Sequence, residues 1–237
     1  MRKDDIFEIF MDVDETLLLI GEQYVKAREN KEITEVLKVK VKSTMENLRS
    51  CLDYCIHDID ELVLNKHREV LYFPYKGTKN DFKTCINKNF KGIRNKKPKI
   101  YDILESVQDF NNVDKPWLSI LCRRTNKVKH DNLLKQSRKD NFQVNIPGFG
   151  TFINSSVTFK NSVMVNNNGE VIPLEFSIDH KGNITGEQSI IKKLSIEKID
   201  WLTFTIAGTN RDVLEFLTQC KNEIQHMVEN IYLEIGV

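Results

Sequence analysis

Between Pro116 and Leu134 the sequence gathers side chains that could carry out chemistry on a phosphodiester. The segment reads PWLSILCRRTNKVKHDNLL, with an apolar first half and a polar, basic middle. An imidazole can transfer a proton near neutral pH, and a guanidinium offers a fixed set of donors to phosphate oxygens. The candidate catalytic residues are therefore Arg124 and His130, and the candidate contacts to nucleic acid are Arg123, Asn126, Lys127 and Lys129.

Helical spacing decides which arginine can lie beside His130. On a continuous helix one stripe contains the residues at i, i+3, i+4 and i+7, which are Arg123, Asn126, Lys127 and His130. Arg124 lies about 120° around the axis from His130, so it aligns only if the helix breaks near Thr125. The alternative is that Asn126 and His130 form a polar cluster beneath the helix while the lysines and arginines are solvated.

Helices are expected to position this segment. Apolar residues recur with helical spacing over 4–28 and 33–66, and again in shorter segments at 81–90 and 100–110. Pro116 suits the first turn of the next helix, and the spacing returns over 211–235. The segment Tyr72–Tyr75 (YFPY) interrupts the helices, because Pro74 disfavours helical backbone in the residue before it.

From Asn141 the composition changes to short β-rich runs separated by Gly and Asn. We therefore expect an α+β protein, with a mainly α-helical bundle and a small antiparallel β-sheet of about five short strands inserted before the C-terminal helix. The expected domains are the bundle at 1–140, the β insertion at 141–207, and a C-terminal helix at 208–237 that packs back on the bundle. Residues 138–148 form the expected seam.

Composition and charge limit the classes of function that this protein can have. The chain has 237 residues, of which 40% are hydrophobic and 29% charged, as is typical of globular proteins. The net charge is only +1, but basic residues cluster between Lys76 and Lys99 and between Arg123 and Lys139. This asymmetry indicates a surface that faces a polyanion, and a solvated lysine-rich loop is the alternative.

Cysteines and hydropathy exclude several other classes. The five cysteines show no CxxC spacing, so we expect buried thiols, no metal and no cofactor. The charged N-terminus does not resemble a signal peptide, and no apolar run is long enough to cross a membrane. We therefore expect a cytoplasmic protein without a membrane partner.

A phosphatase-like string lies near the N-terminus. Asp12, Asp14 and Thr16 match the DxDxT motif of the haloacid-dehalogenase family, in which an Asp nucleophile follows a buried parallel strand. Here the preceding residues have helical spacing, and GTNRD at Gly208–Asp212 is only a distant echo of the family's metal motif. Because a motif needs its structural context, a phosphatase is the remote alternative.

Several motifs between about residues 43 and 136 resemble HEPN-type proteins, which are helical bundles of bacterial defence and toxin–antitoxin systems. The resemblance starts with the helical string MENLRSCLDYCIHDID and the YFPY segment. It continues in the segment after Pro116, where Arg124 and Thr125 are followed by a His six positions after the Arg. The residues that match the family's spaced Leu, Asn and Lys-His pattern are Leu118, Leu121, Asn126, Lys129, His130 and Leu133.

The resemblance implies metal-independent cleavage of RNA by a homodimer. His130 would activate the ribose 2′-hydroxyl or protonate the leaving oxygen, and Arg124 would stabilise charge on the scissile phosphate. RNA and a protein partner, such as an antitoxin or a defence component, are the implied partners. The competing hypothesis is a non-catalytic interaction or regulatory module in which the Arg/His cluster is structural.

Overall fold

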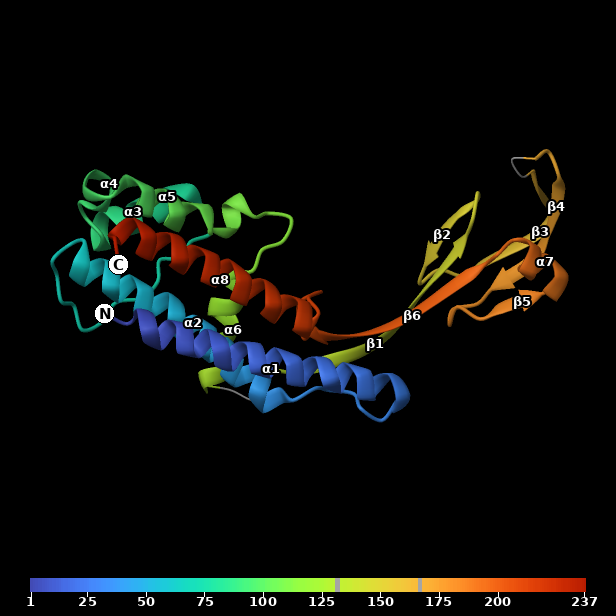
Figure 1. Cartoon of the computed structure of the whole chain (residues 1–237), viewed down its shortest axis with the longest axis horizontal. Coiled ribbons are helices and arrows are strands. Elements are labelled where there is room, and N and C mark those ends of the chain that lie inside the picture. The colour runs from blue at the N-terminus through green and yellow to red at the C-terminus, as the bar shows by residue number, and fades with distance from the viewer. Residues whose placement is uncertain (131–132, 166–167) are drawn as a thin grey trace. The chain divides into compact units, whose positions relative to one another are not determined.

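The chain forms two compact units. A computed structural model describes residues 1–130, 133–165 and 168–237, except for the side chains of 127–130. Unit 1 comprises Met1–Ser137 and Phe204–Val237, and unit 2 comprises Arg138–Thr203. The β insertion is expected over 141–207, and the observed unit 2 spans Arg138–Thr203. The α+β fold class is confirmed, because strands are inserted before the C-terminal helix of a mainly helical chain (Figure 1).

Unit 1 is a helical bundle in which α1, α2 and α8 pack against one another (Figure 1). Helix α6 packs on α2, and α5 packs on α8. Helix α1 shows why the chain folds this way, since residues three, four and seven positions apart, such as Ile6, Phe10, Val13 and Ile20, form its buried side. The elements are α1 (Lys3–Glu29), α2 (Lys38–Leu62), α3 (Lys79–Asn89), α4 (Ile93–Lys96), α5 (Pro98–Ser106), the 3-10 helix η1 (Asp109–Asn111), α6 (Leu118–His130) and α8 (Val213–Ile235).

One carboxylate ties the returning chain to the bundle. Asp212 caps α8, because its Oδ1 accepts hydrogen bonds from the backbone N–H groups of Leu214 at 3.0 Å and Glu215 at 3.1 Å. Its Oδ2 accepts from the Tyr24 hydroxyl at 2.8 Å and from the Phe204 N–H at 2.9 Å. The start of α8 is therefore fixed to α1 and to the strand before it.

Unit 2 contains most of the strand residues, in two three-stranded sheets with the orders β2-β1-β6 and β3-β4-β5. Its core combines alternate residues of the strands, including Phe142, Val144, Phe176 and Ile178, with Ile190 of a short helix. The elements are β1 (Gln136–Ile146), β2 (Gly150–Ile153), β3 (Val157–Val165), β4 (Val171–Ile178), β5 (Ile184–Gly186), α7 (Gln188–Lys193) and β6 (Glu197–Ile206).

The expectation of one sheet with about five strands, joined at a seam over 138–148, is corrected here. Most of that seam belongs to β1, the longest strand in the described part of the chain. Its apolar alternation is limited to Phe142, Val144 and Ile146, while its first half is polar, with Ser137, Lys139 and Asp140 exposed. A strand whose apolar alternation covers only one half resembles a linker in the sequence.

Acid conditions are expected to destabilise the bundle. Burial opposes ionisation of Asp60, but the hydrogen bonds and charge of Arg68 outweigh it and hold the pKa below the ordinary 3.8. The hydrogen bond from Arg2 likewise holds the pKa of Glu61 below 4.5. Carboxyl groups with lowered pKa values stabilise the fold above their ordinary pKa values, and this stabilisation is lost as the pH falls. We expect the unfolding temperature to fall steadily below about pH 4.

Calorimetry between pH 7 and pH 2.5 would test this expectation. In Asp60→Asn the unfolding temperature should fall less steeply with decreasing pH, because the variant no longer titrates at that position. A wild-type unfolding temperature that stays constant down to pH 3 would contradict the prediction.

Candidate functional site

Helix α6 carries the predicted site, and Asp109 fixes its start. Asp109 Oδ1 accepts hydrogen bonds from the backbone N–H groups of Trp117 at 3.0 Å and Leu118 at 3.1 Å, and Oδ2 accepts from that of Ser119 at 2.8 Å. The carboxylate thus pairs donors that a helix start leaves free, and it complements the positive end of the helix dipole. Since Trp117, Leu118 and Leu121 are also buried, the rotation of α6 is set by the core.

The structure places the candidate residues of α6 on different sides. Arg123 and Asn126 are exposed, whereas Arg124 is half-buried. The Arg124 guanidinium lies close to Gly208, where an added Cβ would come within 2.8 Å of Nη2. Helix α6 runs without a break through Thr125, so Arg124 stays off the stripe of Asn126.

The other three candidate residues are Lys127, Lys129 and His130. Their side chains lie outside the described residues. The structure therefore brings together Arg123 and Asn126 on the exposed side of α6 and directs Arg124 to the turn at Gly208.

A groove of about 680 Å³ lies beside α6. One wall is the segment 70–76, which contains the YFPY sequence, and other elements contribute Arg49, Cys85, Asn89 and Asn126. Sequence reasoning placed Asn126 in the site but missed Asn89 and the tyrosines of the wall. The only signal for them was the break in helical spacing at YFPY, next to the basic tract.

Two side chains, the half-buried Asp53 and the fully buried Gln108, hold the backbone of the groove wall. Asp53 Oδ1 accepts a hydrogen bond from the Phe73 N–H at 2.7 Å. Gln108, which is fully buried, accepts from the Lys76 N–H at 3.0 Å and donates to the Pro74 carbonyl at 2.9 Å. Because the backbone is held at Phe73, Pro74 and Lys76 and the Phe73 side chain is buried, this part of the wall is preorganised.

Arg49 supports the groove from beneath. Its guanidinium donates to Cys122 Sγ at 2.8 Å, pairs with Asp53 at 3.1 Å and lies 5.6 Å from the centre of the Tyr75 ring. Burial raises the pKa of the Cys122 thiol to about 12, so this thiol is neutral at pH 7 and is not an activated nucleophile. Arg49 is therefore a structural group whose donors are used inside the protein.

The groove continues along α3 into a second hollow of about 500 Å³. The two hollows share Lys76, Cys85 and Asn89, and the second adds Asp81 and the exposed Lys88, among others. Cationic and amide side chains thus line a track from α6 along α3. Such a lining suits a phosphate backbone better than an apolar ligand.

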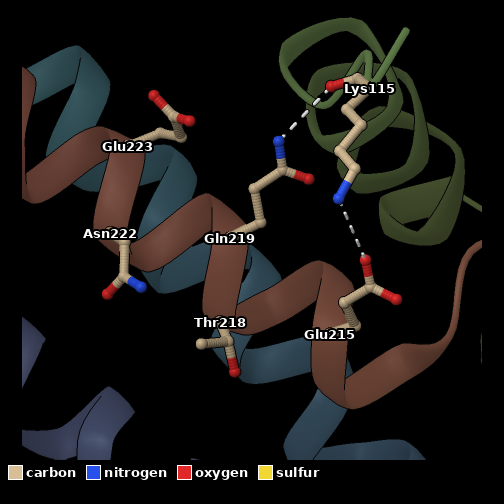
Figure 2. A pocket seen from close by; sticks show the side chains of 6 residues that line it. All are labelled: Lys115, Glu215, Thr218, Gln219, Asn222 and Glu223. Atoms are coloured by element: carbon tan, nitrogen blue, oxygen red, sulfur yellow. Dashed lines mark hydrogen bonds and ion pairs between the residues drawn. The ribbon is translucent and has the colours of Figure 1, made fainter.

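Another hollow, on α8, is lined mainly by acidic and uncharged polar side chains (Figure 2). It is lined by side chains along one side of α8, among them Glu215, Gln219 and Glu223, and by Lys115. Gln219 donates to the Lys115 carbonyl at 3.3 Å, and the Lys115 ammonium lies 4.0 Å from Glu215. With its one cation next to a carboxylate, this hollow does not favour phosphate.

The DVDET string does not gather its carboxylates at one place. It lies within α1, where Asp12 accepts a hydrogen bond from Asn47 of α2 at 3.1 Å. Asp14 instead pairs with Lys221 of α8 at 2.9 Å, and Thr16 is buried. A phosphatase site of this type needs both carboxylates at the end of a strand, and a helix points them to different neighbours.

Two further features are absent from the described residues. No group of three or more His, Cys, Asp and Glu side chains there is placed to hold a metal ion. Among the described helices, none combines the length and the apolar character needed to cross a membrane.

The chain matches no family model, no curated protein and no solved structure.

Proposed function

We propose that the helical unit binds RNA and cleaves it without a metal ion, as the resemblance to HEPN-type proteins implies. The observation that carries this proposal is the exposed side of α6, where Arg123 and Asn126 project and where Asn126 also lines a groove with cationic and aromatic walls. Polyanion binding requires accessible cations, and single-stranded RNA also uses aromatic faces.

In the proposed reaction, His130 takes the proton of a ribose 2′-hydroxyl or donates one to the leaving 5′-oxygen. The 2′-oxygen attacks the adjacent phosphorus, the bond to the 5′-oxygen breaks, and a cyclic phosphate remains on the upstream strand. We assign the charge-stabilising role to Arg123 and not to Arg124. Arg123 is exposed on the stripe of Asn126, whereas the Arg124 guanidinium lies against Gly208.

The same proposal includes a homodimer whose two protomers line one cleft, and a role in bacterial defence with an antitoxin or another defence protein as partner. These elements rest on the resemblance.

The second candidate function is a non-catalytic interaction or regulatory module. It is favoured by the position of Arg124, which is half-buried at the Gly208 turn as a structural side chain would be. In that case the basic surface binds a partner without turnover.

Incubation with RNA in excess EDTA separates these hypotheses. We expect cleavage to continue at an unchanged rate after chelation, because the proposed chemistry uses only imidazole and guanidinium groups. The products should carry cyclic phosphate ends, which mass spectrometry identifies.

Two other outcomes would favour different conclusions. RNA binding without any turnover would support the interaction module, and activity that is lost in EDTA and restored by magnesium would contradict the metal-independent mechanism.

A further inference from the structure

We infer that the groove beside α6 is a subsite for one nucleotide of single-stranded RNA, with its base stacked on Tyr72 and Tyr75. This inference rests on the proposed function, since it names how the same helical unit holds its RNA. Asn126 would face the edge of the base, and Lys76 its phosphate. Each of these four side chains lines the groove.

One aromatic side chain anchors the wall in the core, and the two tyrosines are accessible to a ligand. Phe73 is 2% exposed and fixes the segment in the core, whereas Tyr72 is 68% exposed. Tyr75 is half-buried and is steadied by the Arg49 guanidinium. Because Asp53 and Gln108 already hold the backbone, a base can stack on these rings without first ordering the wall.

Two polar side chains of the groove, Asn126 and Lys76, are available to a ligand. Within the described part of the chain, neither the Asn126 carboxamide nor the Lys76 ammonium has a hydrogen-bonding or ion-pairing partner. A carboxamide presents both donors and acceptors, which match the edge of a base, and an ammonium group binds phosphate as a point charge. Aromatic faces, an amide and a cation together fit a nucleotide.

The groove favours a single strand over a duplex. Bases within a duplex are already stacked and paired, so their faces cannot reach Tyr72. A volume of about 680 Å³ is within the range of small-ligand sites. The adjoining hollow along α3, with Lys88, provides a path for the next phosphate.

Binding of fluorescein-labelled ten-nucleotide RNAs with 2′-O-methyl groups, which block cleavage, tests the inference by anisotropy. We expect Tyr72→Ala to weaken binding about tenfold and Tyr72→Phe to bind like the wild type, since the ring is what stacks. Tyr54→Ala is the matched control, because Tyr54 is also exposed but does not line the groove. Asn126→Ala should reduce the difference in affinity among the four homopolymers.

The outcomes separate the subsite from the proposed function. If the wild type binds RNA and Tyr72→Ala binds equally well, the subsite is wrong and RNA binding stands. If the wild type does not bind RNA, both the proposed function and the RNA subsite are wrong. Titration with 5′-mononucleotides followed by NMR then tests whether the groove binds a free nucleotide instead, in which case the shifts should disappear in Tyr72→Ala.

Discussion

RNA cleavage is expected to fall by about 10²–10⁴-fold when His130 is replaced by alanine, which is the range contributed by a positioned acid–base group. The unfolding temperature should stay near that of the wild type, since a side chain that acts on the substrate need not support the core. Initial cleavage rates in EDTA and calorimetry on the same preparations measure both quantities. His130→Gln, which keeps hydrogen bonding but cannot transfer a proton, should be equally inactive.

The two arginines before His130 provide the matched comparison. Arg123→Ala should reduce cleavage strongly and leave stability unchanged, because Arg123 is exposed. Arg124→Ala should keep most of the activity but lower the free energy of unfolding by about 1 kcal/mol, because the half-buried guanidinium lies close to Gly208.

The reverse pattern would restore Arg124 to the role that the family signature implies. A His130→Ala variant that loses about 1–3 kcal/mol of stability, in a protein without measurable turnover, would instead support the structural cluster.

Replacing Asp58 by alanine is expected to lower the free energy of unfolding by about 2–3 kcal/mol. The Asp58 carboxylate is fully buried, and its Oδ2 accepts hydrogen bonds from the Arg2 N–H and the Tyr232 hydroxyl, each at 2.7 Å. Its Oδ1 pairs with the Arg2 guanidinium at 2.8 Å. Removing it leaves the buried Tyr232 hydroxyl without its acceptor and takes one of two carboxylate partners from Arg2, which still pairs with Glu61 at 2.7 Å.

Urea unfolding followed by circular dichroism would measure this loss. Tyr232→Phe is the graded control, since it removes one donor and should cost about 1 kcal/mol. Burial and the hydrogen bond to Asp58 raise the pKa of Tyr232 above its ordinary 10, so the phenol remains the donor at neutral pH. A loss below about 1 kcal/mol for Asp58→Ala would show that the bundle can relax around the site.

Local patterns in the sequence predicted the α+β class and most of the helices. The spacing of Ile6, Phe10 and Val13 is a property of one segment, so it identifies α1 without knowledge of its neighbours. The polar first half of β1 carried no such pattern, because its pairing with other strands, and not its own alternation, makes it a strand.

The sequence by itself also determined that Arg123, Asn126 and His130 share a stripe on any continuous helix, because the pitch of a helix is fixed. The tertiary structure decided which groups meet that helix. The core turns Arg124 towards Gly208 and Asn126 towards the groove. The groove itself joins side chains from α2, the YFPY wall, α3 and α6, which lie up to 77 positions apart between Arg49 and Asn126. Contacts over such separations depend on how buried faces pack, and no local spacing records them.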